Sequence, residues 1–391
     1  MKSEWTYRPL GELVSFASGG TPSKKRDDYW GGTIPWISAK TLKTENIDTS
    51  DLFITEEGLK AGSKIAPKGS ILLLTRGSGL FNGIPISRVE KDVAFNQDIK
   101  CLDSYGEVEN EFIFYWLLSQ KDYLMAKVGV TGIGAGKFDL DFLQKLMIPI
   151  PSERERKSIV GFASSISEKI RCNAKINDNL QQQAFAAFDN LVANAENTDC
   201  NVSDYAFLNP KRALAKNQMA RSIDMSRLST SRAFPSGWEM KPFAGGMRFT
   251  NGDTLLARIT PCLENGKTAF IDFLDDGEVA FGSTEYIVLA PKNDTPPEML
   301  YCLARNPAFI DYAVKNMNGS SGRQRVSAET VGQYRLPLFD KHSLSIFREV
   351  VSPMFLKMRY NSLENMRLAE LRDELLPKLM SGEIGVSNIR L

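Results

Sequence analysis

The organisation of the chain is decided by Ser152–Ala195, which reads SERERKSIVGFASSISEKIRCNAKINDNLQQQAFAAFDNLVANA. The opening is typical of a helix start, because Ser152 can cap the first turn and Glu155 can complete a capping box. Only Gly161 interrupts the helix-forming residues that follow. Apolar residues recur every three or four positions, with Asn173 in register among them; they are Ile159, Phe162, Ile166, Ile176 and Leu180. The pattern predicts one helix of roughly 58 Å with a narrow apolar stripe.

The same rhythm returns at the end of the chain, from near Lys341. The apolar positions are Phe347, Val351, Met354, Met358, Leu368, Leu375 and Leu379, and the polar steps between them are Asn361, Asn365 and Arg372. Pro353 would cost about 3 kcal/mol inside a helix, so we expect a first helix to end at Val351. Ser352 would then cap a second helix with Pro353 at its first position. Neither stripe can be buried alone, which predicts an antiparallel coiled coil of the two helices.

Each predicted helix follows a segment of short strands, loops and one aromatic-rich helix, and the second segment repeats the first roughly 185 residues later. The first copy contains Pro67–Arg76 (PKGSILLLTR), Val93–Phe95 (VAF), a helix over Phe112–Met125, a glycine-rich loop and Ile148–Pro151 (IPIP). The second copy contains Asn251–Arg258 (NGDTLLAR), Val279–Phe281 (VAF), a helix over Pro297–Lys315, Asn318–Gly322 (NGSSG) and Leu336–Leu338 (LPL). We therefore expect an α+β fold with a pseudo-two-fold internal repeat: two mixed α/β domains joined by two long helices.

Domain boundaries follow from these changes in texture. We expect a first globular domain at 1–152, a spacer helix at 153–195, a second globular domain at 196–340, and a C-terminal helix with its tail at 341–391. Asn194–Cys200 is polar and is predicted to be a linker.

Composition excludes several classes of function. The apolar runs are too short to span a membrane and the N-terminus has no apolar leader, so an intracellular, cytoplasmic protein is expected. Five scattered cysteines predict reduced thiols. The single histidine, His342, excludes a multi-histidine metal site and is expected at the surface or in a helix cap.

The net charge of +1 hides a local excess of basic residues between Tyr205 and Arg248. Only Asp224 and Glu239 oppose eight cations there, which are Lys211, Arg212, Lys216, Arg221, Arg227, Arg232, Lys241 and Arg248. A basic face on a neutral chain suits binding to DNA, although a solvated surface explains the charges equally well.

Catalytic motifs are not supported by the sequence. Gly132–Lys137 fails the phosphate-loop pattern, because Thr131 and Phe138 stand where Gly and Ser or Thr are needed. Asn306–Phe309 (NPAF) is close to the Asn-Pro-Pro-aromatic motif of DNA amino methyltransferases, yet no glycine-rich cofactor motif precedes it. An enzyme, or a methyltransferase with a fused recognition domain, stays open as the alternative.

Recognition chemistry is what remains. Reading base edges needs Arg, Lys, Asn, Gln, Ser or Thr on loops or strand ends, and such residues follow matching strands in both copies. The candidate DNA contacts are Ser18, Gly19, Gly20, Thr21, Lys24, Lys25, Arg26, Thr75, Arg76, Ser78, Lys137, Arg258, Thr260, Lys267, Ser320, Ser321, Arg323 and Arg325.

Several motifs resemble the specificity subunits of type I restriction–modification systems. The opening Leu10–Leu13 with Ser18–Ser23 (SGGTPS) and Ile34–Ile37 (IPWI) is similar to the start of a target recognition domain in that family. The C-terminal Leu371–Ile384 (LRDELLPKLMSGEI) is the most specific part. The second copy departs from the pattern, with Phe207–Lys211 (FLNPK) in place of the Ser-Gly-Gly-Thr-Pro opening.

The resemblance implies a non-catalytic DNA reader in a bacterial or archaeal cytoplasm. Each target recognition domain would read one half of a bipartite, asymmetric site, and the helices would set the unread gap. The helices would also dock two methyltransferase subunits, and restriction subunits that translocate DNA would join them. This chain would bind no cofactor, and the partner subunits would use S-adenosylmethionine, ATP and Mg²⁺.

Overall fold

The computed structural model describes residues 5–42, 44–132, 134–320, 322–386 and 389. The chain forms two compact units: the first comprises Met1–Ser167 with Glu370–Leu391, and the second comprises Glu168–Ala369. Both long helices contribute to both units, so the compact units do not begin or end where the helices do.

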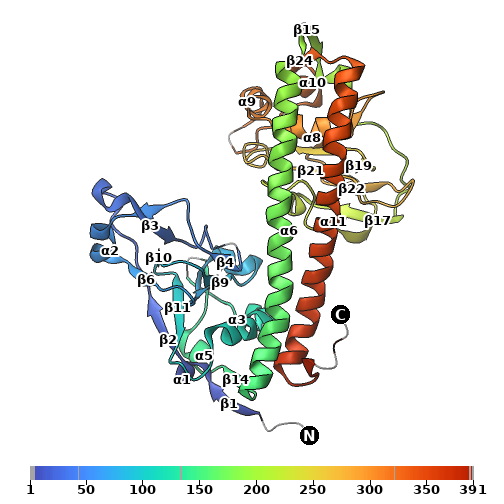
Figure 1. The fold of residues 1–391 in the computed structure, drawn as a ribbon. Coiled ribbons are helices and arrows are strands. Elements are labelled where there is room, and N and C mark those ends of the chain that lie inside the picture. Colours follow the sequence, from blue (N-terminus) through green and yellow to red (C-terminus); the bar gives the residue numbers. More distant parts are fainter. Residues whose placement is uncertain (1–4, 43, 133, 321, 387–388, 390–391) are drawn as a thin grey trace. The chain divides into compact units, whose positions relative to one another are not determined.

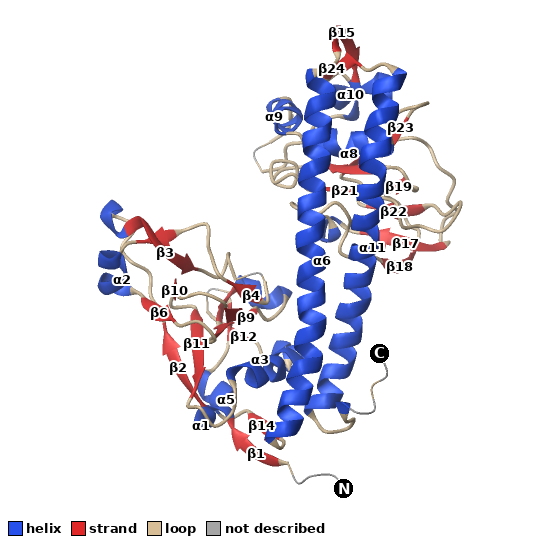
Figure 2. Cartoon of the chain, in the orientation of Figure 1, coloured by secondary structure: helices blue, strands red, loops and turns tan. Residues whose placement is uncertain are grey.

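The first unit contains two main sheets (Figure 2). One has the strand order β2 (Val14–Ser18), β11 (Ile99–Ser104), β7 (Ile71–Leu74), β9 (Ile86–Val89) and β4 (Asn46–Ile47). The other has the order β5 (Phe53–Ile54), β3 (Trp30–Ile37), β10 (Val93–Phe95) and β6 (Lys64–Ala66). The helical segments are α1 (Leu10–Leu13), α2 (Glu56–Gly62), α3 (Asn110–Ser119), α4 (Lys121–Met125), α5 (Leu140–Gln144) and the 3₁₀ turns η1 (Asp27–Tyr29) and η2 (Ser78–Asn82).

The second unit repeats this topology. Its sheets have the orders β16 (Ala206–Leu208), β23 (Tyr286–Pro291), β20 (Thr254–Ala257), β21 (Thr268–Phe270), and β18 (Glu239–Pro242), β17 (Met219–Ile223), β22 (Ala280–Gly282), β19 (Met247–Phe249). Its helical segments are α7 (Val202–Tyr205), η3 (Met225–Arg227), α8 (Pro297–Arg305), α9 (Pro307–Lys315) and α10 (Ala328–Gly332). The parallel pair β3–β10 recurs as β17–β22. The predicted duplication therefore extends to strand order and strand direction.

Each unit also has a two-stranded sheet that joins its first strand to its last. In the first unit β1 (Thr6–Pro9) pairs with β14 (Met147–Ile150), and in the second β15 (Glu196–Asn201) pairs with β24 (Arg335–Leu338). The prediction of a linker at Asn194–Cys200 is therefore wrong. Polar residues have a low intrinsic strand preference, but pairing with β24 satisfies the backbone groups and decides the conformation.

The first long helix, α6 (Glu153–Ala193), begins as predicted. The Glu155 amide donates to Ser152 Oγ at 3.3 Å, and the Ser152 amide donates back to Glu155 Oε2 at 3.1 Å. This reciprocal pair is the capping box read from the sequence.

The second long helix, α11 (Lys341–Met380), runs antiparallel to α6 (Figure 1). Within the second unit, Asn173 donates to Asn365 Oδ1 at 2.9 Å, and Asn361 donates to Asn177 Oδ1 at 2.8 Å. Positions rise along one helix as they fall along the other, so the helices pair in opposite directions. The amides predicted as polar steps in the two stripes therefore contact each other.

The predicted break at Pro353 is wrong, because α11 is one continuous helix. Phe347, Val351 and Phe355 lie on both sides of the proline and are almost fully buried in the core of the second unit. Burying a large apolar side chain contributes roughly 1.5–3 kcal/mol, so these contacts together exceed the local cost of the proline. The proline itself is exposed.

The globular part of each unit packs on the long helices through a different set of contacts. In the second unit, α8 buries Met299–Ala304 in one cluster with Ala184 and Phe188 of α6. In the first unit, Arg372 of α11 donates to Ser167 Oγ of α6 at 3.4 Å. There the largely buried Arg372 of α11 donates to Glu45 at 2.8 Å. Burial lowers the pKa of the neighbouring Lys121 ammonium group.

Replacing Pro353 by alanine should stabilise the protein. Alanine supplies an amide that can donate to the Glu349 carbonyl one turn earlier, which should add about 1–3 kcal/mol to the free energy of unfolding. The shift can be measured as a higher midpoint of thermal unfolding. Lys357→Ala, also exposed on α11, is the control and should change the stability by less than about 0.5 kcal/mol. A Pro353→Ala midpoint equal to or below the wild-type value would contradict the account.

Candidate nucleic-acid interface

The segment Phe95–Lys100 runs from the end of β10 (Val93–Phe95) to the start of β11 (Ile99–Ser104) and contacts several candidate residues of the first unit. The backbone amides of Thr75 and Arg76 both donate to the Asp98 carbonyl, at 2.9 and 3.2 Å. The Thr75 hydroxyl donates to the same oxygen at 3.0 Å, so this buried side chain is committed to the backbone. The end of β7 is thereby fixed beside Asp98, with Arg76 projecting as an exposed side chain.

Arg76 is joined by Lys137, as the sequence repeat suggests. The strands β8 (Arg76–Gly77), β13 (Gly136–Lys137) and β12 (Gly129–Val130) form a small sheet in which Arg76 lies directly opposite Lys137. Both side chains are exposed, and among the described residues neither makes an ion pair. The glycine-rich loop therefore places Lys137 beside Arg76, so two unpaired cations lie at the end of β7. Ser78, which comes two residues after Arg76, is also exposed.

The Ser-Gly-Gly-Thr stretch packs against the same segment. A Cβ atom on Gly19 would lie 2.0 Å from the Phe95 carbonyl oxygen, and one on Gly20 would lie 1.9 Å from the Gly62 carbonyl oxygen. Only glycine permits these approaches. Lys100 Nζ donates to Ser18 Oγ, and Thr21 donates to Gln97 Oε1 at 2.7 Å. This predicted run thus supports Phe95–Lys100, and its own polar groups are used internally.

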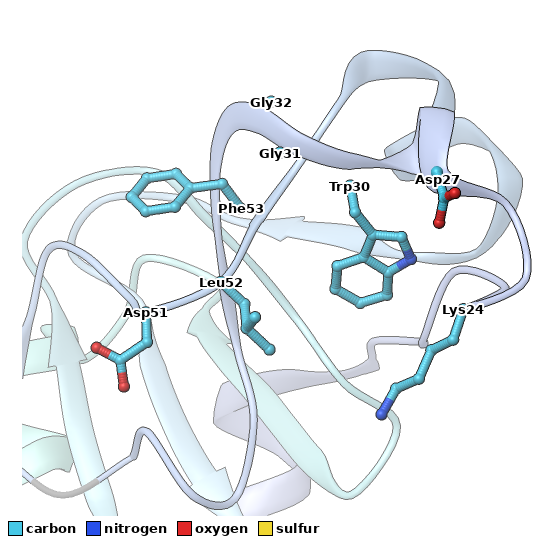
Figure 3. Close-up of a pocket in the computed structure, with 8 residues that line it drawn as sticks. All are labelled: Lys24, Asp27, Trp30, Gly31, Gly32, Asp51, Leu52 and Phe53. Atoms are coloured by element: carbon cyan, nitrogen blue, oxygen red, sulfur yellow. The ribbon is translucent and has the colours of Figure 1, made fainter.

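The basic run Lys24–Arg26 lies farther along the same loop. Arg26 is paired with Asp28 at 2.6 Å and stacks over the Tyr29 ring, whereas Lys24 and Lys25 are exposed. An open hollow with a volume of about 710 Å³ lies beside Lys24 (Figure 3). It is lined by Lys24, Asp27, Trp30, Gly31, Gly32, Asp51, Leu52 and Phe53. Two carboxylates in this lining weaken the attraction of Lys24 for a phosphate.

The second unit builds the same arrangement at the end of β20. The Arg258 amide donates to the Glu285 carbonyl at 3.0 Å, and the Val326 amide donates to the Arg258 carbonyl at 3.0 Å. The equivalent bond in the first unit runs from the Phe138 amide to the Thr75 carbonyl, at 2.9 Å. Two main-chain hydrogen bonds, one at the Thr75 or Arg258 amide and one at its carbonyl, are therefore common to the two strand ends.

The side chains at this second end are arranged differently. Arg325 Nε and Nη2 donate to the two oxygens of Glu285 at 2.9 and 2.8 Å, a bidentate ion pair. Hydrogen bonding to Arg325 lowers the pKa of the Glu285 carboxyl group. Arg258 Nε is buried and has no hydrogen-bond partner among the described residues. The second unit thus presents a paired cation where the first presents free ones.

The remaining candidates of the second unit are partly committed elsewhere. Lys267 Nζ donates to the Met225 carbonyl at 2.9 Å, and the Thr260 hydroxyl donates to Glu264 at 3.3 Å. Ser320 and Arg323 are exposed in the loop that ends at Arg325. Ser321 lies outside the described residues.

Acids from outside the Tyr205–Arg248 segment neutralise two of its eight cations. Arg212 pairs with the buried Asp253, and Arg221 pairs with Glu278 at 2.8 Å. Arg227 and Lys241 pair with the two acids inside the segment. Lys211, Lys216 and Arg232 are exposed and have no ion pair among the described residues. The predicted basic face is therefore reduced to scattered cations.

Sequence reasoning missed Asp98, Glu285 and Gln97. The signal was present, because both acids follow a Val-Ala-Phe strand within four residues and directly precede the next strand. Acidic residues were not predicted as DNA contacts because the DNA backbone is itself negatively charged. The Asn306-Pro-Ala-Phe motif is a helix cap, since Asn306 Oδ1 accepts from the Ala308 amide at 3.0 Å.

The described residues also show neither a metal site nor a membrane-spanning helix. Within the described residues, no group of three or more His, Cys, Asp and Glu side chains is placed to hold a metal ion. No helix in the same part of the chain is long and apolar enough to cross a membrane. Fold and site define a duplicated binding protein in which two similar units each carry cations and a carboxylate at a strand end.

Comparison with known proteins shows similarity to one family. Residues 2–182 match the family described as Type I restriction modification DNA specificity domain. The EcoR124I/EcoR124II specificity subunit of Escherichia coli is 30% identical over 161 residues, which cover 41% of this chain and 40% of that relative. The MjaIX specificity subunit of Methanocaldococcus jannaschii is 24% identical over 99% of this chain and 95% of its own length.

A solved structure has the same fold. The type I restriction–modification system S subunit from M. genitalium superposes with a TM-score of 0.56 at 16% identity, covering 96% of each chain. The first half of the chain therefore matches the DNA specificity domain of type I restriction–modification systems, and nearly the whole chain aligns with a specificity subunit of such a system. These relatives are named as specificity subunits of type I restriction enzymes.

Removing the free cations of the first unit should weaken DNA binding in a salt-dependent way. Arg76→Ala and Lys137→Ala should each lower the slope of log K against log salt concentration by about one if they contact phosphates. The measurement is a titration of duplex DNA at several salt concentrations. Lys145→Ala is the control. Lys145 directly follows α5, and the Leu146 carbonyl next to it accepts from the Leu10 amide of α1, which precedes β2. Lys145 therefore lies at the end of β2 opposite to Ser18. Equal slopes for all three variants and the wild type would contradict the assignment.

Proposed function

We propose that this chain reads a bipartite, asymmetric DNA site, with each unit contacting one half-site and the paired helices setting the unread gap. The observation that carries the proposal is the matched pair of strand ends. Thr75 with Asp98 and Arg258 with Glu285 share one backbone arrangement but differ in the side chains that they present. A common scaffold with different polar groups is what two separate sequence readers require.

The charge distribution supports a reader that works inside a larger assembly. The net charge is +1, and Arg325 at the second strand end is already paired with Glu285. Since phosphate contacts supply much of the affinity for DNA, a chain with few free cations needs a partner to complete the clamp. The proposed partners are two methyltransferase subunits, joined by restriction subunits. This chain itself holds no cofactor, and S-adenosylmethionine, ATP and Mg²⁺ are used by the partners.

The outer face of α11 offers a surface for such a partner. Ile346, Val350, Leu356 and Tyr360 are 49%, 47%, 43% and 58% exposed. At 100° per residue they fall, with Pro353, within an arc of about 120°, opposite the buried Phe347, Val351 and Phe355. In α6, which the structure describes in full, no large apolar side chain is exposed. We name Ile346, Val350, Leu356 and Tyr360 the α11 stripe and assign it to a methyltransferase subunit.

The gap-setting role can be tested by lengthening the helices. Seven residues inserted between Ile166 and Leu180 of α6, with a matching insertion in α11, keep the stripe in register. The assembled complex should then methylate sites with the same two half-sites and a longer gap, as seen by mapping methylated adenines in a genome. Altered half-sites would contradict the gap-setting role. Methyl transfer from labelled S-adenosylmethionine by the purified chain alone would overturn the non-catalytic role.

The α11 stripe can be tested by charge. Val350→Asp together with Tyr360→Asp should reduce the affinity for the methyltransferase subunit at least tenfold, because an isolated charge is costly to bury in an interface. Isothermal titration or co-purification gives the measurement, and circular dichroism verifies that the variant is folded. Gln183→Asp, on the exposed side of α6, is the matched control. A folded double variant that binds as tightly as the control would remove the stripe from the interface.

A further inference from the structure

Each unit places one carboxylate at the same point of its strand end. Asp98 precedes β11 and Glu285 precedes β23, and the main-chain carbonyl of each accepts from the residue that follows the central strand. In both units, the loop that carries Lys137 or Arg325 returns to the same strand end. The acid is thus a repeated part of the site rather than an accident of one copy.

A carboxylate is unfavourable in a site that only binds phosphates. Like charges repel, and in a partly desolvated interface that repulsion is much stronger than in bulk water. The DNA groups that favour a carboxylate are the exocyclic amino groups of the bases, which are hydrogen-bond donors on the base edges. A repeated acid among cations therefore indicates contact with a base rather than with the backbone.

Glu285 is prepared as an acceptor. Its side chain is 26% exposed, and the Arg325 guanidinium fixes both oxygens in place. A carboxylate has about four acceptor positions, so the bidentate pair leaves others available. Hydrogen bonding to Arg325 also lowers its pKa, which keeps the group ionised near neutral pH.

Asp98 shows that the repeated acid is not explained by ion pairing within the protein. Asn96 Nδ2 donates to Asp98 Oδ2 at 3.3 Å, and the Asp98 amide donates to Asn96 Oδ1 at 3.2 Å. Among the described residues, Asp98 makes no ion pair, so it is not there to neutralise a neighbouring cation. The two acids share their place in the fold but have different partners within the protein. The partners therefore do not explain why both units carry an acid at this position, whereas contact with DNA does.

We propose that Asp98 and Glu285 are specificity-determining residues, each accepting a hydrogen bond from the amino group of a base in the half-site read by its unit. The cations beside them, Arg76 and Lys137 or Arg258, contact phosphates or neighbouring acceptors and hold the acid against the base edge. This inference rests on the proposed function, because it assumes that each unit reads a half-site.

The test uses the full chain assembled with methyltransferase subunits, and the readout is the set of methylated DNA sequences. Glu285→Gln keeps the shape of the side chain but removes its charge and half of its acceptor capacity. It should lower discrimination at one base pair of one half-site by roughly 5- to 150-fold, the range of a good base contact, and leave the other half-site unchanged. Asp98→Asn should do the same at one base pair of the opposite half-site.

Matched controls exist in both units. Glu278 is ion-paired with Arg221 in the second unit but lies away from the strand end. Asp103 accepts from Asn110 Nδ2 at 2.7 Å at the far end of β11 in the first unit. Glu278→Gln and Asp103→Asn should leave both half-sites unchanged.

The outcomes separate the inference from the proposed function. A wild-type complex that methylates no bipartite sequence would overturn both. A wild-type complex with two defined half-sites, together with Glu285→Gln and Asp98→Asn complexes that keep every position, would overturn the inference alone. If Glu285→Gln does not assemble, Glu285→Asp keeps the charge and shortens the reach. Its expected result is weaker discrimination at the same base pair, and unchanged discrimination would overturn the inference.

Discussion

The structure depends on buried amides that join the two long helices. Asn173 and Asn361 are almost fully buried, and they hydrogen-bond to Asn365 and Asn177 across the pair. An apolar stripe alone would tolerate a shift of one turn, because one aliphatic contact resembles the next. A shifted amide is buried without a partner and costs about 1–3 kcal/mol. The amides therefore select one register and one direction of pairing. The packing of α8 against both helices in the second unit depends on that register.

The duplicated strand ends show how one scaffold holds two different sites. In both units the residue after the central strand donates its amide to the carbonyl of the residue just before the neighbouring strand. These main-chain hydrogen bonds set the position of the side chains that follow. Side chains are then free to differ. Arg76 and Lys137 are unpaired cations, whereas Arg325 is committed to Glu285. Divergence in side chains over a conserved hydrogen-bond pattern separates recognition from folding.

Local patterns in the sequence predicted those parts of the fold that depend on neighbouring residues. The Ser152–Glu155 capping box, the strand repeats and the polar steps of the two helices follow from spacing alone. Pro353 and Asn194–Cys200 were predicted wrongly, because distant contacts decide both: the core around Val351 and the pairing with β24. For the site, the sequence indicated Arg76 and Lys137. It could not indicate that Lys267 is committed to the Met225 carbonyl or that Arg325 is held by Glu285, because those partners are distant in sequence.

The pairing of cations inside the second unit has a consequence for how tightly and how selectively it binds. A free cation attracts any phosphate, and that attraction is independent of sequence and falls steeply with salt. A cation already held in a bidentate pair contributes little to such attraction, because its charge is cancelled at short range. The same pair fixes a directional acceptor, which rewards a base that presents a donor and penalises one that does not. Arg212 with Asp253, Arg221 with Glu278 and Arg325 with Glu285 thus lower indiscriminate binding by the second unit. Sequence-independent attraction is left to the exposed cations of both units that are unpaired among the described residues, and to the partner that completes the clamp.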